Sequence, residues 1–121
     1  MELADIYLKA AQVIKSNGHA KGDFYSIPEG VVGITLDRSE WLVCALGALA
    51  VATFGDPYPP PEDVEGHNEF AAAAAHLSAR INYDAAPGAG PMERVAEWND
   101  ADGRTPADVI AVFERAAREV A

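Results

Sequence analysis

Cys44 is the only cysteine of the chain, and it is the one side chain that could serve as a strong nucleophile. A cysteine-dependent enzyme would pair the thiol with a histidine base, His67 or His76, and would use Asn99 or Asp100 to orient that base. The thiol would also need a helix N-terminus or a nearby cation to lower its pKa. The sequence instead places Cys44 in the second turn of an apolar helix, where burial raises the pKa. We therefore interpret Cys44 as a packing residue, and an enzyme that uses Cys44 or Asp100 with a histidine is the alternative hypothesis.

Metal and phosphate motifs are incomplete in this chain. His67, Glu69 and His76 lack the i, i+4 histidine pair that puts two ligands on one helical face. The run Asp100-Ala101-Asp102-Gly103 matches part of a calcium loop, but its alignment leaves non-ligating residues at the first and twelfth positions. A single cysteine also excludes an internal disulfide and the multi-cysteine zinc sites. No cofactor is implied, and His19 is interpreted as an exposed loop residue.

A helix start is encoded near the C-terminus. Thr105 can cap the helix with its hydroxyl, Pro106 suits the first helical position, and Asp108 completes a Thr-x-x-Asp capping box. From Val109 to Val120 the apolar residues recur at spacings of three and four, as on one buried face. The pattern predicts a helix over residues 106–120.

The turn before that helix contains the most distinctive residues of the sequence. We expect Trp98 to insert into the core, and Asn99 and Asp100 to tie the turn together. Arg104 should lie close enough to form an ion pair with Asp100 or Asp102. Turn chemistry of this kind is usually architectural, so these residues and the Thr105 cap are candidate signature residues of the fold first, and of an interaction site second.

The most apolar part of the chain is predicted to be its central helix. Asp37-Arg38-Ser39-Glu40 forms a second capping-box pattern, and the run from Trp41 to Phe54 that follows has no polar face. A helix without a polar face must be covered on every side. Gly47 costs about 1 kcal/mol of helix propensity relative to alanine, and close packing is the expected compensation.

The remaining segments complete a mainly α fold. Apolar periodicity predicts further helices over residues 2–17, 68–80 or 68–82, and 92–98, while residues 31–36 are β-branched enough for one short strand. The length of 121 residues suits one domain over residues 1–121. We predict a compact bundle of about four helices around the central apolar helix, with at most one minor β element.

Charge is the remaining functional indication. The net charge of −10 argues against direct nucleic-acid binding, because affinity for phosphate backbones comes from cationic side chains. A proline-rich segment follows the central helix, and no lysine or arginine lies between Asp56 and Ala79. The candidate interaction residues there are Asp56, Tyr58, Glu62, Asp63 and Glu65. Such a surface could steer a protein partner with a basic surface, or it could only keep the protein soluble.

The sequence also predicts a cytoplasmic location without membrane contact. The start of the chain, Met1 to Asp5, is acidic and lacks the basic and apolar regions of a secretion signal. The longest apolar run is shorter than the ~20 residues that a membrane-spanning helix needs. A single cysteine suits a reducing compartment.

Three short motifs suggest a relationship. They are Cys44-Ala45-Leu46-Gly47-Ala48-Leu49, Trp98-Asn99-Asp100 and Arg104-Thr105, and they accompany a predicted first helix with the Ala-Ala-x-x-Ile pattern from Ala10 to Ile14. In these features the chain resembles a family of small uncharacterised proteins of actinobacteria and their phages, a domain of unknown function. The resemblance covers nearly the whole chain, except around Gly22 to Leu36. It implies a small helical cytosolic protein but no activity.

These observations favour a non-enzymatic interaction protein over an enzyme, although the sequence leaves the question open. The leading hypothesis is that an acidic surface and the proline-rich segment dock onto a partner protein. The resemblance makes a phage-encoded modulator of a host protein the narrower form of this hypothesis. An acidic mimic of DNA is less favoured, because many of the acids alternate with small apolar residues rather than following phosphate-like intervals. The sequence does not indicate an oligomeric state.

Overall fold

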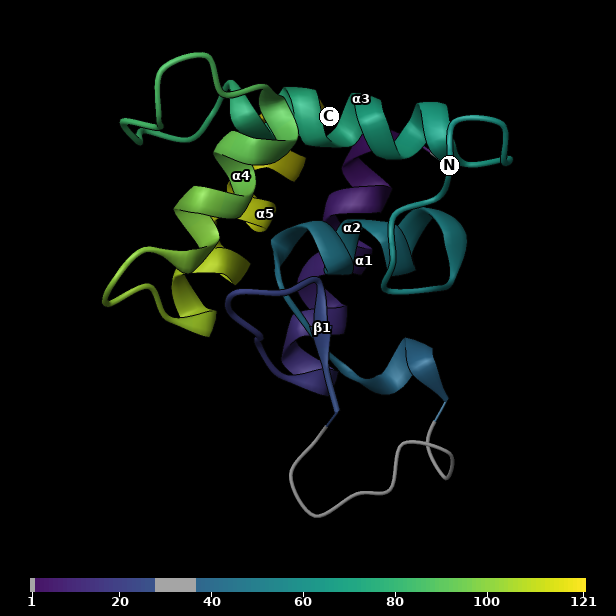
Figure 1. The fold of residues 1–121 in the computed structure, drawn as a ribbon. Helices are drawn as coiled ribbons and strands as arrows, with labels where there is room; N and C mark the ends of the chain where they lie inside the picture. Colours follow the sequence, from purple (N-terminus) through teal and green to yellow (C-terminus); the bar gives the residue numbers. More distant parts are fainter. Residues whose placement is uncertain (1, 28–36) are drawn as a thin grey trace.

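Five α-helices dominate the structure, a computed structural model that describes residues 2–27 and 37–121 (Figure 1). The helices are α1 (Leu3–Asn17), α2 (Ala45–Phe54), α3 (His67–Ser78), α4 (Pro91–Asp100) and α5 (Pro106–Val120). Two very short strands, β1 (Tyr25–Ser26) and β2 (Leu42–Val43), form the described sheet, and a 3-10 turn, η2 (Arg38–Glu40), precedes β2. The predicted mainly α class with a minor β element is confirmed. The predicted strand over residues 31–36 lies outside the described part of the chain.

The apolar helix α2 is the centre of the core. Its residues from Ala45 to Ala52 are all buried, and α1, α3 and α4 pack against it (Figure 1). The fifth helix, α5, packs mainly along α1 and so forms a second layer. Phe54, at the end of α2, is exposed. The helix ends at Gly55, whose left-handed φ of 84° suits a residue without a Cβ.

The predicted start of α2 is wrong. Asp37 does cap a turn by accepting from the backbone amide of Ser39, but that turn is η2 and it ends at Glu40. The chain then becomes extended, because Val43 pairs with Tyr25 of β1 and also bridges to His19 in the segment after α1. The helix begins only at Ala45. These extended pairings join residues distant in sequence, so the local capping pattern could not predict them.

The other helix ends follow local sequence more closely. The α5 capping box forms as predicted: the Thr105 hydroxyl accepts from the Asp108 amide, and the Asp108 carboxylate accepts from the Thr105 amide. Pro91 and Pro106 occupy first-turn positions. On α1, the buried Tyr7 hydroxyl donates to the carbonyl of Ala73 in α3 at 2.7 Å. Over the parts of the chain that the structure describes, no helix has both the length and the hydrophobicity needed to cross a bilayer.

Candidate functional site

A cavity of about 180 Å³ opens beside the start of α2 and the end of α4. Its walls combine apolar side chains with carboxylates and a thiol. The residues that line it are Gly22, Asp23, Phe24, Cys44, Leu46, Ala96 and Asp100. The site therefore contains Cys44 and Asp100, both of which the sequence had marked as candidates for chemistry.

Cys44 is the N-cap of α2 rather than a residue of its second turn. Its Sγ accepts a hydrogen bond from the Gly47 amide at 3.3 Å, and its side chain is buried. Burial raises the pKa of the Cys44 thiol to about 11, and the backbone amides of Gly47 and Leu46 offset only part of that effect. The thiol pKa is raised, as the sequence predicted, but the predicted position of Cys44 in the second turn of the helix was wrong. The thiol is therefore neutral at physiological pH and poorly suited to nucleophilic attack.

The two histidines considered as bases do not line this cavity. His67 begins α3, and its Nδ1 lies 3.0 Å from the carbonyl oxygen of Pro60. His76 is exposed in the last turn of α3. Within the described residues, no hydrogen bond joins either histidine to Cys44 or Asp100, so the proposed catalytic pairs are not assembled.

His19 was expected to be a simple exposed loop residue, and this expectation is wrong. Its side chain is half-buried, and Nε2 lies 2.7 Å from Oδ1 of Asn99. The partners of Asn99 determine the role of this ring nitrogen. Asn99 Oδ1 also accepts from the Ala45 amide at 3.0 Å, and Nδ2 donates to the Ala20 carbonyl at 3.1 Å. Because Oδ1 is the acceptor, His19 Nε2 must carry a proton and donate it.

Asn99 thus joins three parts of the chain that are remote in sequence. It is fully buried in the last turn of α4, where its side chain contacts the segment after α1 and the first residue of α2. Its Nδ2 also donates to Oδ1 of the neighbouring Asp100 at 2.9 Å, and the same oxygen accepts from the Gly22 amide at 2.9 Å. The sequence predicted that Asn99 and Asp100 tie a local turn. The structure shows that they tie α4 to distant segments.

Trp98 and Arg104, which lie near Asn99 in the sequence, have structural roles. Trp98 is buried as predicted, and the Arg104 guanidinium lies 4.4 Å from the centre of its ring. Arg104 Nε donates to the Trp98 carbonyl at 2.9 Å. The predicted ion pair of Arg104 with Asp100 or Asp102 is wrong for the described chain, because the guanidinium instead donates to the Trp98 carbonyl and stacks on the indole.

The second candidate site is the loop over residues 55–66, here called the acidic loop. The loop is only partly exposed, because Pro57 and Pro60 are buried. Asp56 forms a two-point ion pair with Arg38, with distances of 3.0 and 3.2 Å, and this contact lowers the pKa of the carboxyl. The Arg38 guanidinium also lies over the ring of Tyr25 (4.9 Å to its centre). Asp56 therefore anchors the loop and is not free for a partner.

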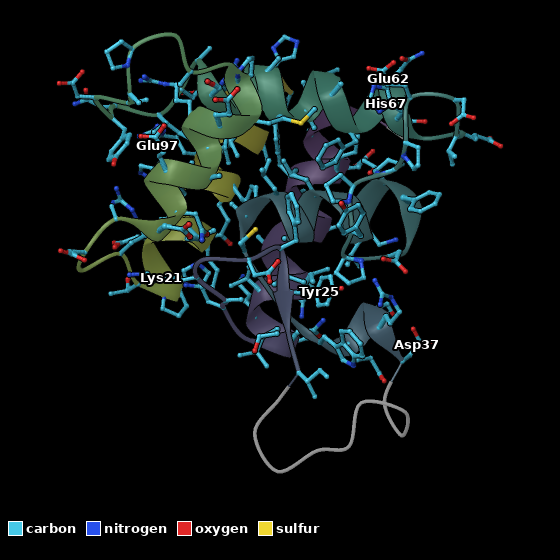
Figure 2. All side chains as sticks on the ribbon, in the orientation of Figure 1. Lys21, Tyr25, Asp37, Glu62, His67 and Glu97 are labelled. Atoms are coloured by element: carbon cyan, nitrogen blue, oxygen red, sulfur yellow. The ribbon has the colours of Figure 1, made fainter. Side chains whose placement is uncertain are left out.

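The other candidates of the acidic loop remain available at the surface. Glu62, Asp63 and Glu65 are exposed, and no ion pair engages them within the described residues. Glu62 lies at the same end of α3 as His67 in the view of Figure 2. Tyr58 is 56% exposed, and its ring meets the Phe24 ring edge-on at 5.4 Å. Because Phe24 lines the cavity, Tyr58 links the acidic loop to it.

Fold and sites together define a small mainly α protein with an acidic surface loop and a carboxylate-bearing cavity. The sequence profile of a family of unknown function, DUF6197, matches residues 1–119, and the chain belongs to this family. No curated protein and no solved structure matches the chain. The expected resemblance to a domain of unknown function is therefore confirmed, and the family supplies no activity.

Proposed function

We propose that this protein is a non-enzymatic interaction protein of the cytoplasm that docks its acidic loop onto a basic surface of a partner protein. A phage-encoded modulator of a host protein is the narrower form of the proposal. The observation that carries it is a set of exposed carboxylates, on Glu62, Asp63 and Glu65, that no cation of the described chain neutralises.

The placement of the basic residues supports this proposal. Between Arg38 and Arg80 the sequence contains no lysine or arginine. Arg38 is paired with Asp56, and Arg80 is paired with Glu119 at 3.0 Å. The negative potential of the loop is consequently not cancelled by its neighbours, and such a field speeds association with a positively charged partner.

The contacts that hold the acidic loop in place also support the proposal. The buried Pro57 and Pro60, the Arg38–Asp56 ion pair and the contact of His67 with the Pro60 carbonyl all fix the loop against the core. A surface that is already ordered loses less conformational entropy when it binds. The exposed carboxylates thus sit on a rigid support.

The test compares two triple variants of equal net charge. Glu62→Gln/Asp63→Asn/Glu65→Gln removes the exposed carboxylates of the loop. Glu2→Gln/Asp84→Asn/Asp102→Asn removes three exposed carboxylates elsewhere that form no ion pair within the described chain. Each immobilised protein captures partners from host lysate at 50 mM and 500 mM NaCl, and mass spectrometry identifies them.

We expect wild type and the control variant to retain the same basic proteins at low salt and to release them at high salt. The loop variant should not retain them, because screening and neutralisation remove the same attraction. Equal capture by both variants, or capture that is insensitive to salt, would refute the proposal.

A further inference from the structure

We propose that the cavity beside the start of α2 accepts the cationic side chain of a lysine or arginine that belongs to a basic segment of the partner protein. This inference rests on the proposed function, and it assigns a specific subsite to the same partner. The geometry, the charge and the position of the cavity each support it.

The size and walls of the cavity suit an alkyl chain with a charged end. Its volume of about 180 Å³ corresponds to about six water molecules at ~30 Å³ each, which is enough for a lysine side chain. Phe24, Leu46 and Ala96 offer apolar surface for methylene groups. Long cationic side chains commonly bury their stems in this way and keep the charged group at a polar position.

The charge of the cavity comes from Asp100, with Asp23 as a second carboxylate in its wall. Asp100 Oδ1 accepts from Gly22 and Asn99, whereas no side chain or amide of the described residues donates to Oδ2. Asp100 is also the last residue of α4, where the helix dipole adds negative potential. A cation placed here would meet both the carboxylate and the helix end.

Among the residues that the structure describes, no cation already fills this role. No lysine or arginine lines the cavity over the described chain, and residues 28–36 contain none in the sequence. The nearby Lys21 donates from Nζ to the Ala101 carbonyl at 2.9 Å, beside the loop that joins α4 to α5 (Figure 2). The Lys21 ammonium group is therefore engaged by a backbone carbonyl outside the cavity wall.

An anion is disfavoured even though α2 begins at the cavity. The amide of Ala45 donates to Asn99, the amide of Gly47 donates to the Cys44 sulfur, and the amide of Ala48 donates to the Cys44 carbonyl. The Leu46 amide also faces the Cys44 sulfur and lowers the pKa of the thiol, so the donors of the first turn point at groups of the protein itself. Oδ2 of Asp100, by contrast, has no donor among the described residues, and a carboxylate oxygen requires one.

The position of the cavity connects it to the acidic loop. Tyr58 of the loop packs edge-on against Phe24, which is part of the cavity wall. A basic segment that lies across the loop can therefore reach the cavity with one side chain, and the exposed Tyr58 ring adds a surface for a cation–π contact.

The experiment is an NMR titration of the whole protein with N-acetyl-lysine methylamide, with N-acetyl-arginine methylamide in parallel and N-acetyl-norleucine methylamide as the uncharged control. The test variant is Asp100→Asn, which keeps an oxygen to accept from Gly22 and Asn99 but loses the charge. Asp102→Asn is the matched control, because Asp102 is exposed and does not line the cavity. Ala96→Leu fills the cavity without altering charge.

We expect saturable shifts of the Gly22, Phe24 and Leu46 amides with a Kd on the order of 1 mM for at least one cationic probe. Norleucine should bind at least about tenfold more weakly, and Asp100→Asn and Ala96→Leu should each weaken the cationic probe by a similar factor. Asp102→Asn should change the Kd less than about twofold. Amide spectra of the unliganded variants verify that each one folds.

Three results would overturn the inference: equal shifts with norleucine, full binding by Asp100→Asn, or shifts confined to the acidic loop. The loop variant of the capture experiment separates this failure from failure of the proposed function. If that variant loses its basic partners while the cavity takes no cation, docking through the loop stands and the subsite is wrong. If the cavity binds lysine but capture does not depend on the acidic loop, the cation subsite is supported and docking through the loop is refuted.

Discussion

Replacing Asn99 by alanine should destabilise the fold strongly. The Asn99 side chain is fully buried and makes four hydrogen bonds, two of them to backbone groups of Ala20 and Ala45. Alanine would leave the buried Ala45 amide and Ala20 carbonyl without these partners. At about 1–3 kcal/mol for each stranded group, the free energy of unfolding should fall by about 2–6 kcal/mol. This is a large part of the ~5–15 kcal/mol typical of whole domains.

Urea unfolding measures this change directly. Trp41 and Trp98 are both buried, so their fluorescence reports loss of the core. With a urea dependence of about 2 kcal/mol per M, the unfolding midpoint should fall by about 1–3 M. Asn82→Ala is the matched control, since Asn82 is exposed and its change should stay within about 0.5 kcal/mol.

The result that would refute this reasoning is a small effect. If Asn99→Ala lowers the free energy of unfolding by less than about 1 kcal/mol, at an unchanged urea dependence, then the Asn99 contacts do not stabilise the junction of α1, α2 and α4. Water entering the site in place of the amide would then satisfy the two backbone groups.

Three further predictions follow from single residues. Cys44 should react with iodoacetamide at pH 8 at least about 100-fold more slowly in the folded protein than in urea, because burial raises the pKa from 9.0 to about 11; comparable rates would contradict the assigned burial. Gly47→Ala should destabilise the protein by about 1–3 kcal/mol or more despite better helix propensity, because the new Cβ would lie 2.1 Å from the Phe24 carbonyl oxygen. Gly90→Ala, whose Cβ would lie an ordinary 3.5 Å from the Glu93 Oε1, is the control in the same thermal melts. The Asp108 carboxyl has a lowered pKa because it accepts from the backbone amide at the α5 N-cap, so its stabilising contribution exists above pH ~4 and is lost as the pH falls through the folded-state pKa. Asp108→Asn should therefore flatten the acid side of the stability profile, and parallel wild-type and variant profiles below pH 4 would argue against this.

The sequence predicted best those features that depend on a few adjacent residues. The Thr105 cap, the burial of Trp98 and the close packing at Gly47 all follow from local chemistry or from the apolar pattern. At Gly47, the sequence predicted close approach but not the neighbour, which is the Phe24 carbonyl. Sequence pattern shows that a surface must be covered, but it does not identify what covers it.

The features that the sequence missed depend on contacts between distant segments. The start of α2 shifted to Ala45 because residues 42–43 pair with β1, and no local pattern encodes that pairing. His19 looked like a loop residue because its partner, Asn99, lies 80 positions away. The sequence did place Asn99 directly after Trp98, which was predicted to be buried. Because a buried amide requires several hydrogen-bond partners, this position was the available indication that Asn99 bonds to other segments.

The packing of α5 along α1 has a consequence for the order of synthesis. Lys15 and Glu114 form an ion pair across these helices although they are 99 residues apart. On a ribosome that adds about 5–20 residues per second, roughly 5–20 s pass between translation of the two helices. During that time the part of α1 that α5 covers in the folded protein lacks its final partner, so this apolar surface stays available for other contacts until α5 has been made.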